Sequence, residues 1–556
     1  MSETDKLNAS GTVVPPQGGA PAAAAPGRTS KQAWLSLATV GLGIMMVQLD
    51  GTVVVVANPA IANDLDAGLN SLQWVMTGYL LVLAGLLIPA GNLVDRIGRK
   101  KGLITGLVGF TVASVLCAAS QTIELLIAAR VLQGVFGAML IPAALAIIKA
   151  AFPPEKLAMA IGLFSGVTAL SLAGGPLLGG VMVEHLTWPW VFLINVPFGF
   201  LSVVMAVIIV KESKQEPPQP LDLPGGVTLT LSIVSLVWAL THGQEDGWSS
   251  VSTLGYIGLG LLLLAAFITI QLKRSHPMVP LELFRIRSLW VGCLLMIVTM
   301  FAFYAIIYYL NFFLQGMQGK SPMSASVALL PLTLTFIVSA PLGGWATEKF
   351  GVKGSLSFGA LCIAGTSLLL LRLEGDSGLS TVGPPLVLGG IGVGFMMVAA
   401  TQAIVGSAPV DKAGTASGMQ QSMSQLGSLL GTAVFGAIIS ALVTSRFSGK
   451  LDAAFGGAGG RTVDELAGDA QVQKLVELGF PPTARTALEK ELTSAGMSAD
   501  QVKEFSATFT QAAHDTFISG LHTVFLISAA VAVVAALLSL LVSNKDTKGD
   551  QMAAFV

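Results

Sequence analysis

The chain has 556 residues, a length that in a water-soluble protein would form three or four domains. Its composition excludes that class, because 53% of the residues are hydrophobic and only 11% are charged, against about 25% in a soluble domain. The net charge of −1 provides no basic field for nucleic acid. The composition therefore predicts a protein whose solvent is lipid.

Residues 1–33 are rich in Pro, Gly, Ala and Ser and have no apolar core of signal-peptide length, which predicts a disordered tail. A membrane helix needs about 20 apolar residues. Fourteen runs reach about that length, and they are continuously apolar, whereas the strands of a membrane barrel alternate. The predicted transmembrane helices are 34–60, 72–91, 102–121, 125–149, 158–183, 191–210, 225–242, 253–272, 288–315, 325–346, 354–372, 383–406, 414–443 and 519–542.

The distribution of Lys and Arg predicts the orientation of these helices. Most of the 30 basic residues fall in the N-terminal tail, the C-terminal tail and every second loop, whereas the alternate short loops hold only Lys320 and Arg372. Because short cytoplasmic loops carry the excess of basic residues, we expect both termini to be cytoplasmic. An even number of helices agrees with that orientation.

A ten-residue motif occurs twice. Residues 91–100 and 344–353 both read Gly-x3-acid-base-x-Gly-x-base, after the second and the tenth predicted span. Two six-helix repeats with two helices inserted between them explain this spacing, an architecture typical of transporters. The predicted regions are a cytoplasmic tail (1–33), an N-terminal bundle (34–211), a linker with two extra helices (212–287), the C-terminal bundle (288–443), an extracytoplasmic, partly helical loop (444–518), the last helix (519–543) and a cytoplasmic tail (544–556).

The first copy of this motif favours a gating role on the cytoplasmic side. Its glycines permit a tight turn, and its acid beside three bases can join two helix bundles and release them when the bundles rock. Simple positive-inside anchoring is the alternative, although anchoring alone requires neither the acid nor the glycines. The predicted gating residues are Gly91, Asp95, Arg96, Gly98, Arg99 and Lys100.

With this loop the chain resembles the major facilitator superfamily, whose signature G-x3-D-R-x-G-R-K is present intact. Four further stretches resemble its fourteen-span drug:proton antiporter branch, of the multidrug and quaternary-ammonium resistance type. They are Leu49–Val54, Gln73–Leu80, Arg130–Gly134 and Trp188–Pro197. The resemblance implies two six-helix bundles of this superfamily with two inserted central helices, making an all-α polytopic membrane protein.

The fifth span carries small residues in a spacing that resembles the antiporter motif of the same branch. Small residues four apart allow helices to approach closely, and a proline beside a glycine permits a bend. The resemblance implies a leak-tight hinge that favours antiport, and ordinary helix packing remains the alternative. The motif residues are Gly162, Ser171, Gly175, Pro176, Gly179 and Gly180, with Ser171 at a position that is usually glycine.

Only Asp50 and Arg130 are charged side chains well inside the predicted spans. A charge at the bilayer centre costs at least ~2.5–3.5 kcal/mol, so each is expected to face a partner or a cavity. We predict that Asp50 binds a proton in one conformation and releases it in another, with Arg130 changing its proton affinity. A bound organic cation would then compete with the proton. In the alternative, the pair only stabilises packing.

Polar and aromatic side chains of several spans are candidates for a substrate cavity, together with methionines whose flexible thioethers suit varied apolar ligands. Core or lipid-facing packing is the simpler explanation for most of the methionines. The candidate cavity residues are Gln48, Trp74, Tyr79, Gln133, Asn311, Gln315 and Gln425.

Other functional classes lack their motifs. Gly319–Ser321 resembles part of a P-loop, but Leu314 stands where the motif requires glycine, so no nucleotide site is predicted. We expect no cofactor, no metal, no nucleic-acid partner and no enzymatic activity, with a proton gradient as the energy source.

The sequence thus predicts a multi-pass protein of the cell (inner) membrane, expected to be a monomer, that exports hydrophobic, often cationic drugs in exchange for protons by alternating access. Two alternatives stay open. One is a dedicated exporter of a single endogenous metabolite, antibiotic or lipid. The other is a membrane scaffold or sensor that transports nothing.

Overall fold

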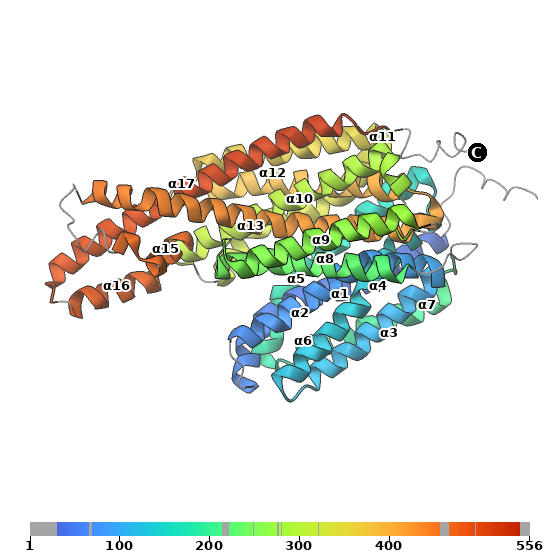
Figure 1. The fold of residues 1–556 in the computed structure, drawn as a ribbon, viewed down its shortest axis with the longest axis horizontal. Coiled ribbons are helices and arrows are strands. Elements are labelled where there is room, and N and C mark those ends of the chain that lie inside the picture. Colours follow the sequence, from blue (N-terminus) through green and yellow to red (C-terminus); the bar gives the residue numbers. More distant parts are fainter. Residues whose placement is uncertain are drawn as a thin grey trace, which may run out of the picture.

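The computed structural model describes residues 31–544 except 66–68, 214–221, 248, 275–276, 280, 321, 456–465 and 495. Helices make up nearly all of this part of the chain, and they lie roughly parallel in two lobes (Figure 1). The predicted all-α polytopic class is therefore confirmed. Pro176 and Gly180 of the predicted antiporter motif lie in a helix, and only this helical backbone is described for them.

The N-terminal lobe consists of α1 (Lys31–Asp64), α2 (Leu69–Ile97), α3 (Arg99–Ala118), α4 (Ile123–Ala151), α5 (Pro154–His185), α6 (Trp190–Leu193) and α7 (Asn195–Ile209). The predicted sixth span is thus a short helical turn followed by a helix. The side chain of Trp188, just before this turn, donates a hydrogen bond of 2.7 Å to Asp64 and ties it to the end of α1.

The C-terminal lobe consists of α10 (Arg287–Asn311), the π-helical turn η2 (Phe312–Met317), α11 (Pro322–Leu369), η3 (Leu370–Arg372), α12 (Leu379–Thr401), the π-helical turn η4 (Gln402–Gly406), η5 (Val410–Lys412), α13 (Ala413–Ala454) and α17 (Ala499–Ser539). Helix α11 contains two of the predicted helices, 325–346 and 354–372. They are separated by a kink at Gly351, where φ is +84°. The 3-10 turn η1 (Leu281–Arg285) precedes this lobe.

The repeated motif adopts the same conformation in both lobes. Its second glycine, Gly98 or Gly351, has a positive φ of 111° or 84°, which L side chains rarely adopt. The next helical segment is capped in the same way in both. Glu212, just after α7, accepts from the backbone N–H of Lys100 at 3.1 Å, and Asn544, after α17, accepts from that of Lys353 at 3.1 Å.

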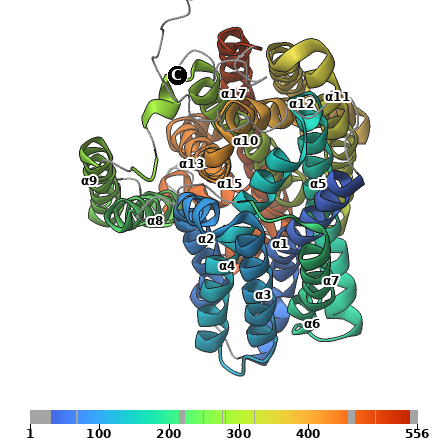
Figure 2. The ribbon, with the colours of Figure 1, turned by 90° about the vertical axis from the view of Figure 1, so that its right-hand side faces the viewer.

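The two inserted helices, α8 (Leu223–Asp246) and α9 (Val251–Lys273), form an antiparallel pair at the periphery (Figure 2). Helix α8 lies against α2 and α13, at the seam between the lobes, and α9 lies outside it. Thr230 of α8 donates to the carbonyl of Gly85 on α2 at 3.0 Å, and Ser232 donates to Gly260 on α9 at 2.8 Å.

Helices α13 and α17 continue beyond the lobes and form a projecting outer segment with α15 (Ala470–Glu477) and α16 (Pro482–Ser494) (Figure 1). The predicted boundaries of the outer loop were 444 and 518, whereas α13 continues to Ala454 and α17 already begins at Ala499. Buried aromatic packing, such as Phe447 against Phe509 with ring centroids 5.6 Å apart, stabilises these extensions.

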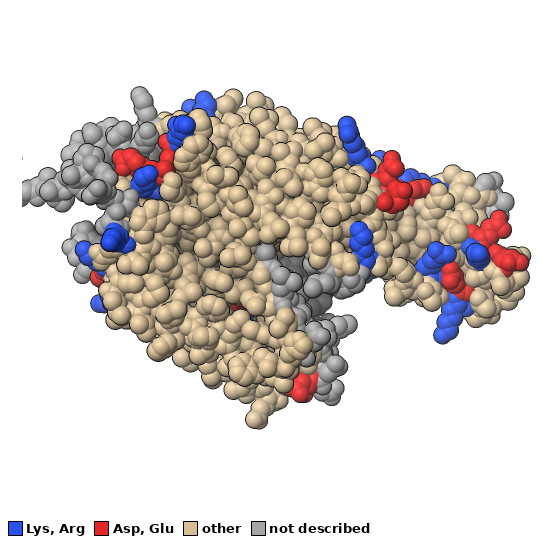
Figure 3. All heavy atoms as spheres, turned by 180° about the vertical axis from the view of Figure 1, so that it is seen from behind, with Lys and Arg blue, Asp and Glu red and all other residues tan. Residues whose placement is uncertain are grey.

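The described helices include 12 stretches long and apolar enough to cross a membrane, one of which, Val327–Arg372, contains both halves of α11. Charged side chains gather toward the two ends of the molecule, and the broad surface between them is nearly free of charge (Figure 3). This pattern fits a lipid-facing belt. We call the end that carries the loop of Arg96, Arg99, Lys100 and Lys101, together with Lys149, the basic face.

Candidate functional site

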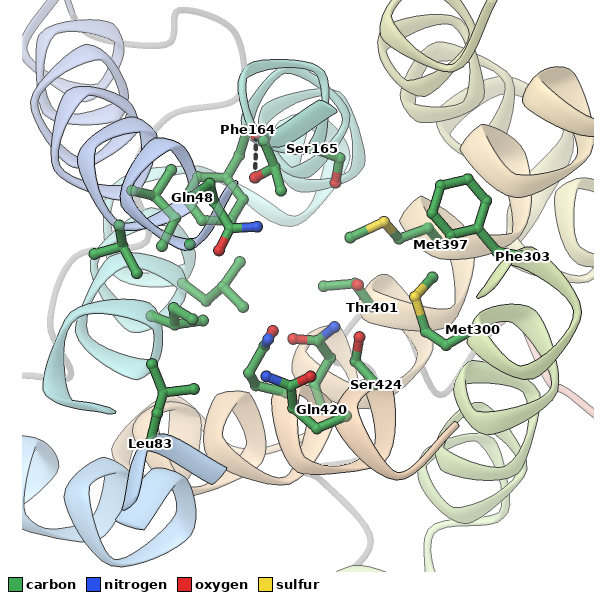
Figure 4. Close-up of a pocket in the computed structure, with 18 of the residues that line it drawn as sticks. Gln48, Leu83, Phe164, Ser165, Met300, Phe303, Met397, Thr401, Gln420 and Ser424 are labelled. Carbon is green, nitrogen blue, oxygen red and sulfur yellow. Dashed lines mark hydrogen bonds between the residues drawn. The ribbon is translucent and has the colours of Figure 1, made fainter. Parts of the chain in front are cut away.

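A cavity of about 340 Å³ lies between the lobes, a size at the lower end of small-molecule sites. Helices α1, α2, α4 and α5 of one lobe and α10, α11, α12 and α13 of the other contribute its wall. Side chains from both sides point into the open centre (Figure 4). The polar lining residues are Gln48, Thr52, Tyr79, Ser165, Thr168, Tyr304, Thr401, Gln420, Gln421, Ser424 and Gln425.

Beside this cavity, Asp50 and Arg130 form an ion pair of 2.5 Å, and both side chains are completely buried. The second carboxylate oxygen of Asp50 accepts hydrogen bonds from the amides of Gln133, at 2.9 Å, and Asn195, at 2.8 Å. The hydroxyl of Ser114 accepts from both amides, at 2.8 and 3.2 Å. Every described partner of the carboxylate is a donor, which matches its ionised form, because a protonated acid would carry a donor of its own.

Arg130 is held on several sides. It donates to the carbonyl of Val75 at 3.2 Å and to the side-chain oxygen of Gln133 at 2.6 Å. Its guanidinium carbon lies 4.2 Å from the centroid of the Tyr79 ring, within the range of cation–π attraction. One guanidinium nitrogen, Nη2, has no hydrogen-bond partner among the described residues. The Nη2 group of Arg130 can therefore form a new hydrogen bond if the side chains around it rearrange.

Asp50 itself does not line the cavity. Its neighbours Gln48, Gly51 and Thr52 face the open space, whereas its carboxylate points into the N-terminal lobe toward α3, α4 and α7. In this conformation a substrate in the cavity does not touch the carboxylate. The geometry thus differs from the expectation that an organic cation competes with the proton at Asp50.

At the basic face, Asp95 joins the two lobes. Its carboxylate accepts from the backbone N–H groups of Gly414 and Thr415, at 3.0 Å each, and from Arg99 at 3.2 Å. Gly414 and Thr415 are in the first turn of α13, where free N–H groups and the helix dipole favour an anion. The acid of the predicted gating motif therefore caps a helix of the opposite lobe.

Basic side chains complement this contact at the opposite kind of helix terminus. Lys149, at the end of α4, is buried and donates to the backbone carbonyls of Val405, Gly406 and Ala408, where η4 ends. Arg99 donates to the carbonyl of Val410. Cations are favoured where helix carbonyls lack partners. One lobe thus supplies an anion to a helix start of the other lobe, the cation of Lys149 to the end of η4, and the cation of Arg99 to the carbonyl of Val410 beside it.

Glycines bring the lobes into backbone contact at the same face. A Cβ atom on Gly414 would lie 2.6 Å from the carbonyl oxygen of Gly91, and one on Gly418 would lie 2.6 Å from that of Leu87. The contact of α5 with α11 is similar, since a Cβ on Gly162 would lie 2.6 Å from the carbonyl oxygen of Ala340. Distances under 3 Å leave no room for a side chain, so the basic face is closed.

Other members of the two motifs have more local contacts. Lys100 donates to the carbonyl of Val207 at 2.7 Å, and Arg96 is partly buried. Ser171 is buried and donates to the carbonyl of Val167 at 2.8 Å. Gly175 and Gly179 face α1, where a Cβ would meet Thr52 or Val53. The glycines of α5 therefore serve two interfaces: the other lobe near the basic face, and α1 farther along.

The second copy of the loop motif repeats the inter-lobe contact more weakly. Glu348 on α11 accepts from the backbone N–H of Met159 on α5 at 3.3 Å and pairs with Lys156 at 3.8 Å. The Lys156 side chain is 46% exposed, whereas that of Arg99 is 3% exposed. The two copies are therefore related by the repeat, but the first is the better buried.

Of the seven predicted cavity residues, Gln48, Tyr79 and Gln425 line the cavity. Gln133 belongs to the Asp50 cluster instead. Trp74 is 42% exposed and packs on Trp238 of α8, because the inserted pair covers this side of α2. Gln315 and Asn311 bond to each other at 2.5 Å near the outer end of α10, beyond the cavity. Helical position alone could not separate these cases.

Several residues of the site carried no assigned role in the sequence. Asn195 stood within a recognised motif, and a buried amide in a membrane span is the signal that could have revealed it. Lys149 is the last residue of the predicted span 125–149, and a lysine at a span end is typical of membrane helices. Ser114 and Gln420 gave no local signal. Among the described residues, no group of three or more His, Cys, Asp or Glu side chains could hold a metal ion.

Comparison with known proteins agrees with this architecture. The Major Facilitator Superfamily profile matches residues 40–432, so the chain belongs to that family of membrane transporters. It is 38% identical over 91% of both chains to the tetracenomycin C resistance and export protein of Streptomyces glaucescens. It is 32% identical to the multidrug transporter protein MdtP of Bacillus subtilis, over 71% of this chain and 73% of that one.

Among solved structures, the human organic anion transporter MFSD10 superimposes with a TM-score of 0.53 at 13% identity, over 90% of this chain and all of that one. At that identity the likeness concerns the fold alone. The family resemblance stated from the sequence is confirmed, and the chain is a transporter and not an enzyme.

Proposed function

We propose that this protein is a proton-coupled antiporter that exports hydrophobic drugs or toxic compounds across the cell membrane by alternating access. The observation that carries the proposal is the fully buried Asp50–Arg130 pair beside, but outside, a central cavity. Similarity to a resistance and export protein and to a multidrug transporter supports the direction and the class of substrate.

The basic face is the cytoplasmic side in this proposal, since short basic loops mark that side. The contacts of Asp95, Arg99 and Lys149 then close the cavity from the cytoplasm, and the conformation described is the one in which substrate leaves outward. Export requires that these contacts break and form once in each cycle. They connect backbone groups and side chains of separate lobes, which suits a rocking motion.

Protonation of Asp50 is the proposed coupling step. A neutral acid no longer compensates Arg130, and it offers a donor where three donors already converge. The arrangement around Asp50 must then change, and the free Nη2 group of Arg130 can find a new partner. The proton thereby biases the equilibrium between the two conformations, and proton release on the cytoplasmic side restores the pair.

The proton gradient supplies sufficient energy. One inward proton gains ~2.3 kcal/mol per 100 mV and ~1.36 kcal/mol per pH unit. For an uncharged substrate exchanged with one proton, the sum supports a gradient of a few hundredfold. For a monovalent cation exchanged with one proton, the voltage contributions cancel, and only the pH gradient drives export.

The second candidate is a dedicated exporter of one metabolite or antibiotic. It is favoured by the 38% identity to a protein named for a single compound, tetracenomycin C. Breadth of substrate separates the two functions: a multidrug exporter lowers the accumulation of several unrelated compounds, and a dedicated exporter lowers that of one chemical series. A monomer in the cell membrane suffices for either, because the cavity and the proton site lie within one chain.

The test compares wild-type protein with Asp50→Asn in proteoliposomes that carry an imposed pH gradient. We expect the variant to lose uphill export of a fluorescent substrate and substrate-induced proton movement, while downhill exchange of substrate for substrate persists. Asp376→Asn, at an exposed loop position, is the matched control and retains both activities. Uphill export at the wild-type rate by Asp50→Asn would remove Asp50 from the mechanism.

A further inference from the structure

The wall of the central cavity differs in charge from the usual site for an organic cation. None of the described residues that line it is Asp, Glu, Lys, Arg or His. The two nearest charges, Asp50 and Arg130, compensate each other inside the N-terminal lobe. A ligand with a formal charge would lose its hydration and find no counter-charge on this wall, which is strongly unfavourable.

The ring of Tyr79 is not free to hold a ligand cation. A cation can be held by the face of a ring, and Tyr79 lines the cavity. The guanidinium of Arg130 already lies 4.2 Å from the centroid of that ring. A second cation near Tyr79 would therefore meet a positive group and not a free aromatic face.

One buried amide, however, lacks a partner for its acceptor. Gln420 of α13 is 2% exposed, and its Oε1 atom has no hydrogen bond to any described residue. Its amide nitrogen reaches only the sulfur of Met296, at 3.8 Å. A buried acceptor without a partner is costly, and a ligand hydroxyl would satisfy it when the amide, which belongs to the cavity wall, turns toward the open space. Thr401 and Ser424 lie beside it and add hydroxyl groups (Figure 4).

The rest of the wall suits a flat apolar body. Phe164 comes from one lobe, and Met300, Phe303 and Met397 come from the other, with the open space between them (Figure 4). Thioethers and phenyl rings contact aromatic rings favourably without fixing one orientation. Apolar surfaces thus face each other across the cavity, and α13 adds the polar side chains Gln420, Gln421, Ser424 and Gln425.

We infer that this cavity binds an uncharged, hydroxylated aromatic molecule, whose rings lie between the two lobes and whose hydroxyl group donates to Gln420. The inference rests on the proposed export function and specifies its substrate. It departs from the often cationic substrate that the sequence suggested. An uncharged substrate also makes one-for-one exchange with a proton electrogenic, so both the voltage and the pH gradient drive export.

Equilibrium binding to the purified full-length protein in lipid nanodiscs at pH 6.5 tests this inference. Three probes share one ring system: 2,6-dihydroxyanthraquinone, whose hydroxyls are not tied up by the quinone carbonyls, its derivative with one trimethylammonium group, and anthraquinone without hydroxyls. We expect the uncharged dihydroxy probe to bind at least about tenfold more tightly than the cationic one. Equal or tighter binding of the cationic probe to the wild type would overturn the inference.

Two variants of one residue test the contact. Gln420→Leu is expected to weaken the binding of the dihydroxy probe by about 3- to 10-fold, which corresponds to the loss of one hydrogen bond. The affinity for the unsubstituted probe should stay unchanged. Gln420→Glu supplies the missing negative charge and is expected to increase the affinity for the cationic probe. Gln511→Leu, on the exposed outer segment, is the matched control. If Gln420→Leu and Gln511→Leu bind all three probes alike, Gln420 is not the contact.

These measurements use no gradient, so they do not depend on proton coupling. Failure of the Asp50 test leaves the ligand preference intact, and failure of the probe series leaves the proton site intact. The two proposals can therefore be rejected separately.

Discussion

The two lobes differ in the charge that they bury near the middle of the bundle. The N-terminal lobe buries a complete ion pair, Asp50 with Arg130, and surrounds it with amides and a hydroxyl. Among the described residues of the C-terminal lobe, no Asp, Glu, Lys or Arg is fully buried, and its polar groups at the cavity are Thr401, Gln420 and neighbouring neutral side chains.

The difference indicates that the N-terminal lobe binds the proton, whereas neutral side chains at the cavity bind the substrate. A charged group that changes its protonation state needs partners that adjust to it, and these lie within one lobe. A site that accepts varied ligands is better built from neutral side chains, which impose little desolvation cost. Proton and substrate then communicate through the positions of the lobes and not through a shared carboxylate. The following predictions test this separation, from the largest expected effect to the smallest.

The largest effect is expected at the ion pair. Arg130→Met leaves the carboxylate of Asp50 buried without its cation, which should destabilise the protein by about 3–5 kcal/mol. The double variant Asp50→Leu/Arg130→Met replaces the pair by apolar groups, so most of that stability should return while uphill export stays absent. Thermal unfolding in detergent and gradient-driven transport measure the two effects.

Recovery of both stability and uphill export in the double variant would show that the pair is only structural. The comparison between the lobes would then lose its basis.

The next effect is expected at the basic face. Lys149→Met removes a buried cation from three backbone carbonyls of the opposite lobe and should favour opening of this face by about 1.5–3 kcal/mol. Spin-label distances between the ends of α4 and α12 report the opening. Lys156→Met is the matched control, since its 46% exposed side chain makes a pair worth ~0–1 kcal/mol. Equal distances in both variants would contradict the role of Lys149.

Backbone packing should give a comparable or smaller effect. Gly414→Ala places a Cβ within 2.6 Å of the carbonyl oxygen of Gly91 and should separate α13 from α2, at a cost of about 1–3 kcal/mol. Gly354→Ala is the control, because the nearest atom to its Cβ, in Phe350, is 3.6 Å away. Distances between labels on α2 and α13 should increase in the first variant only, and an unchanged distance would argue against close glycine packing as the seal.

The smallest effect is expected at an exposed pair in the outer segment. Hydrogen bonds from Ser506, at 2.6 Å, and Arg485, at 2.9 Å, lower the pKa of Glu489 below its usual value. A depressed pKa stabilises the fold above the unfolded pKa, about 4.3, and the gain is lost as the pH falls through the folded value. Hydrogen exchange of α16 should therefore increase slightly below pH 4.

Ser506→Ala should weaken that pH dependence without altering transport. A large loss of export in this variant would show that the outer segment takes part in the cycle, contrary to the division between the lobes.

Much of the fold could be predicted from local patterns. Runs of about 20 apolar residues mark membrane helices because unpaired backbone groups are not tolerated in lipid. The repeated motif at 91–100 and 344–353 revealed two related halves, and both copies adopt the same turn at Gly98 and Gly351. The helix ends were predicted less well where α13 and α17 leave the lobes, because there they are stabilised by packing on each other and not by lipid.

The site could be predicted only in part, for a related reason. Asp50 and Arg130 stand out in any reading of the sequence, since a charge in an apolar run demands a partner. Asn195 bonds to Asp50, which lies 145 residues away in the sequence, and to Ser114, which lies 81 residues away. No local pattern encodes such a proximity.

The sequence by itself determined the solvent, the helical class, the repeat and the two charges that must be buried, because each follows from the composition of one segment. Only the tertiary structure decided that Asp50 faces away from the cavity, that Lys149 caps a helix of the other lobe, and that Gln420 keeps a free acceptor. These properties depend on which helices become neighbours and how each is rotated, and that is fixed by packing between segments far apart in the chain.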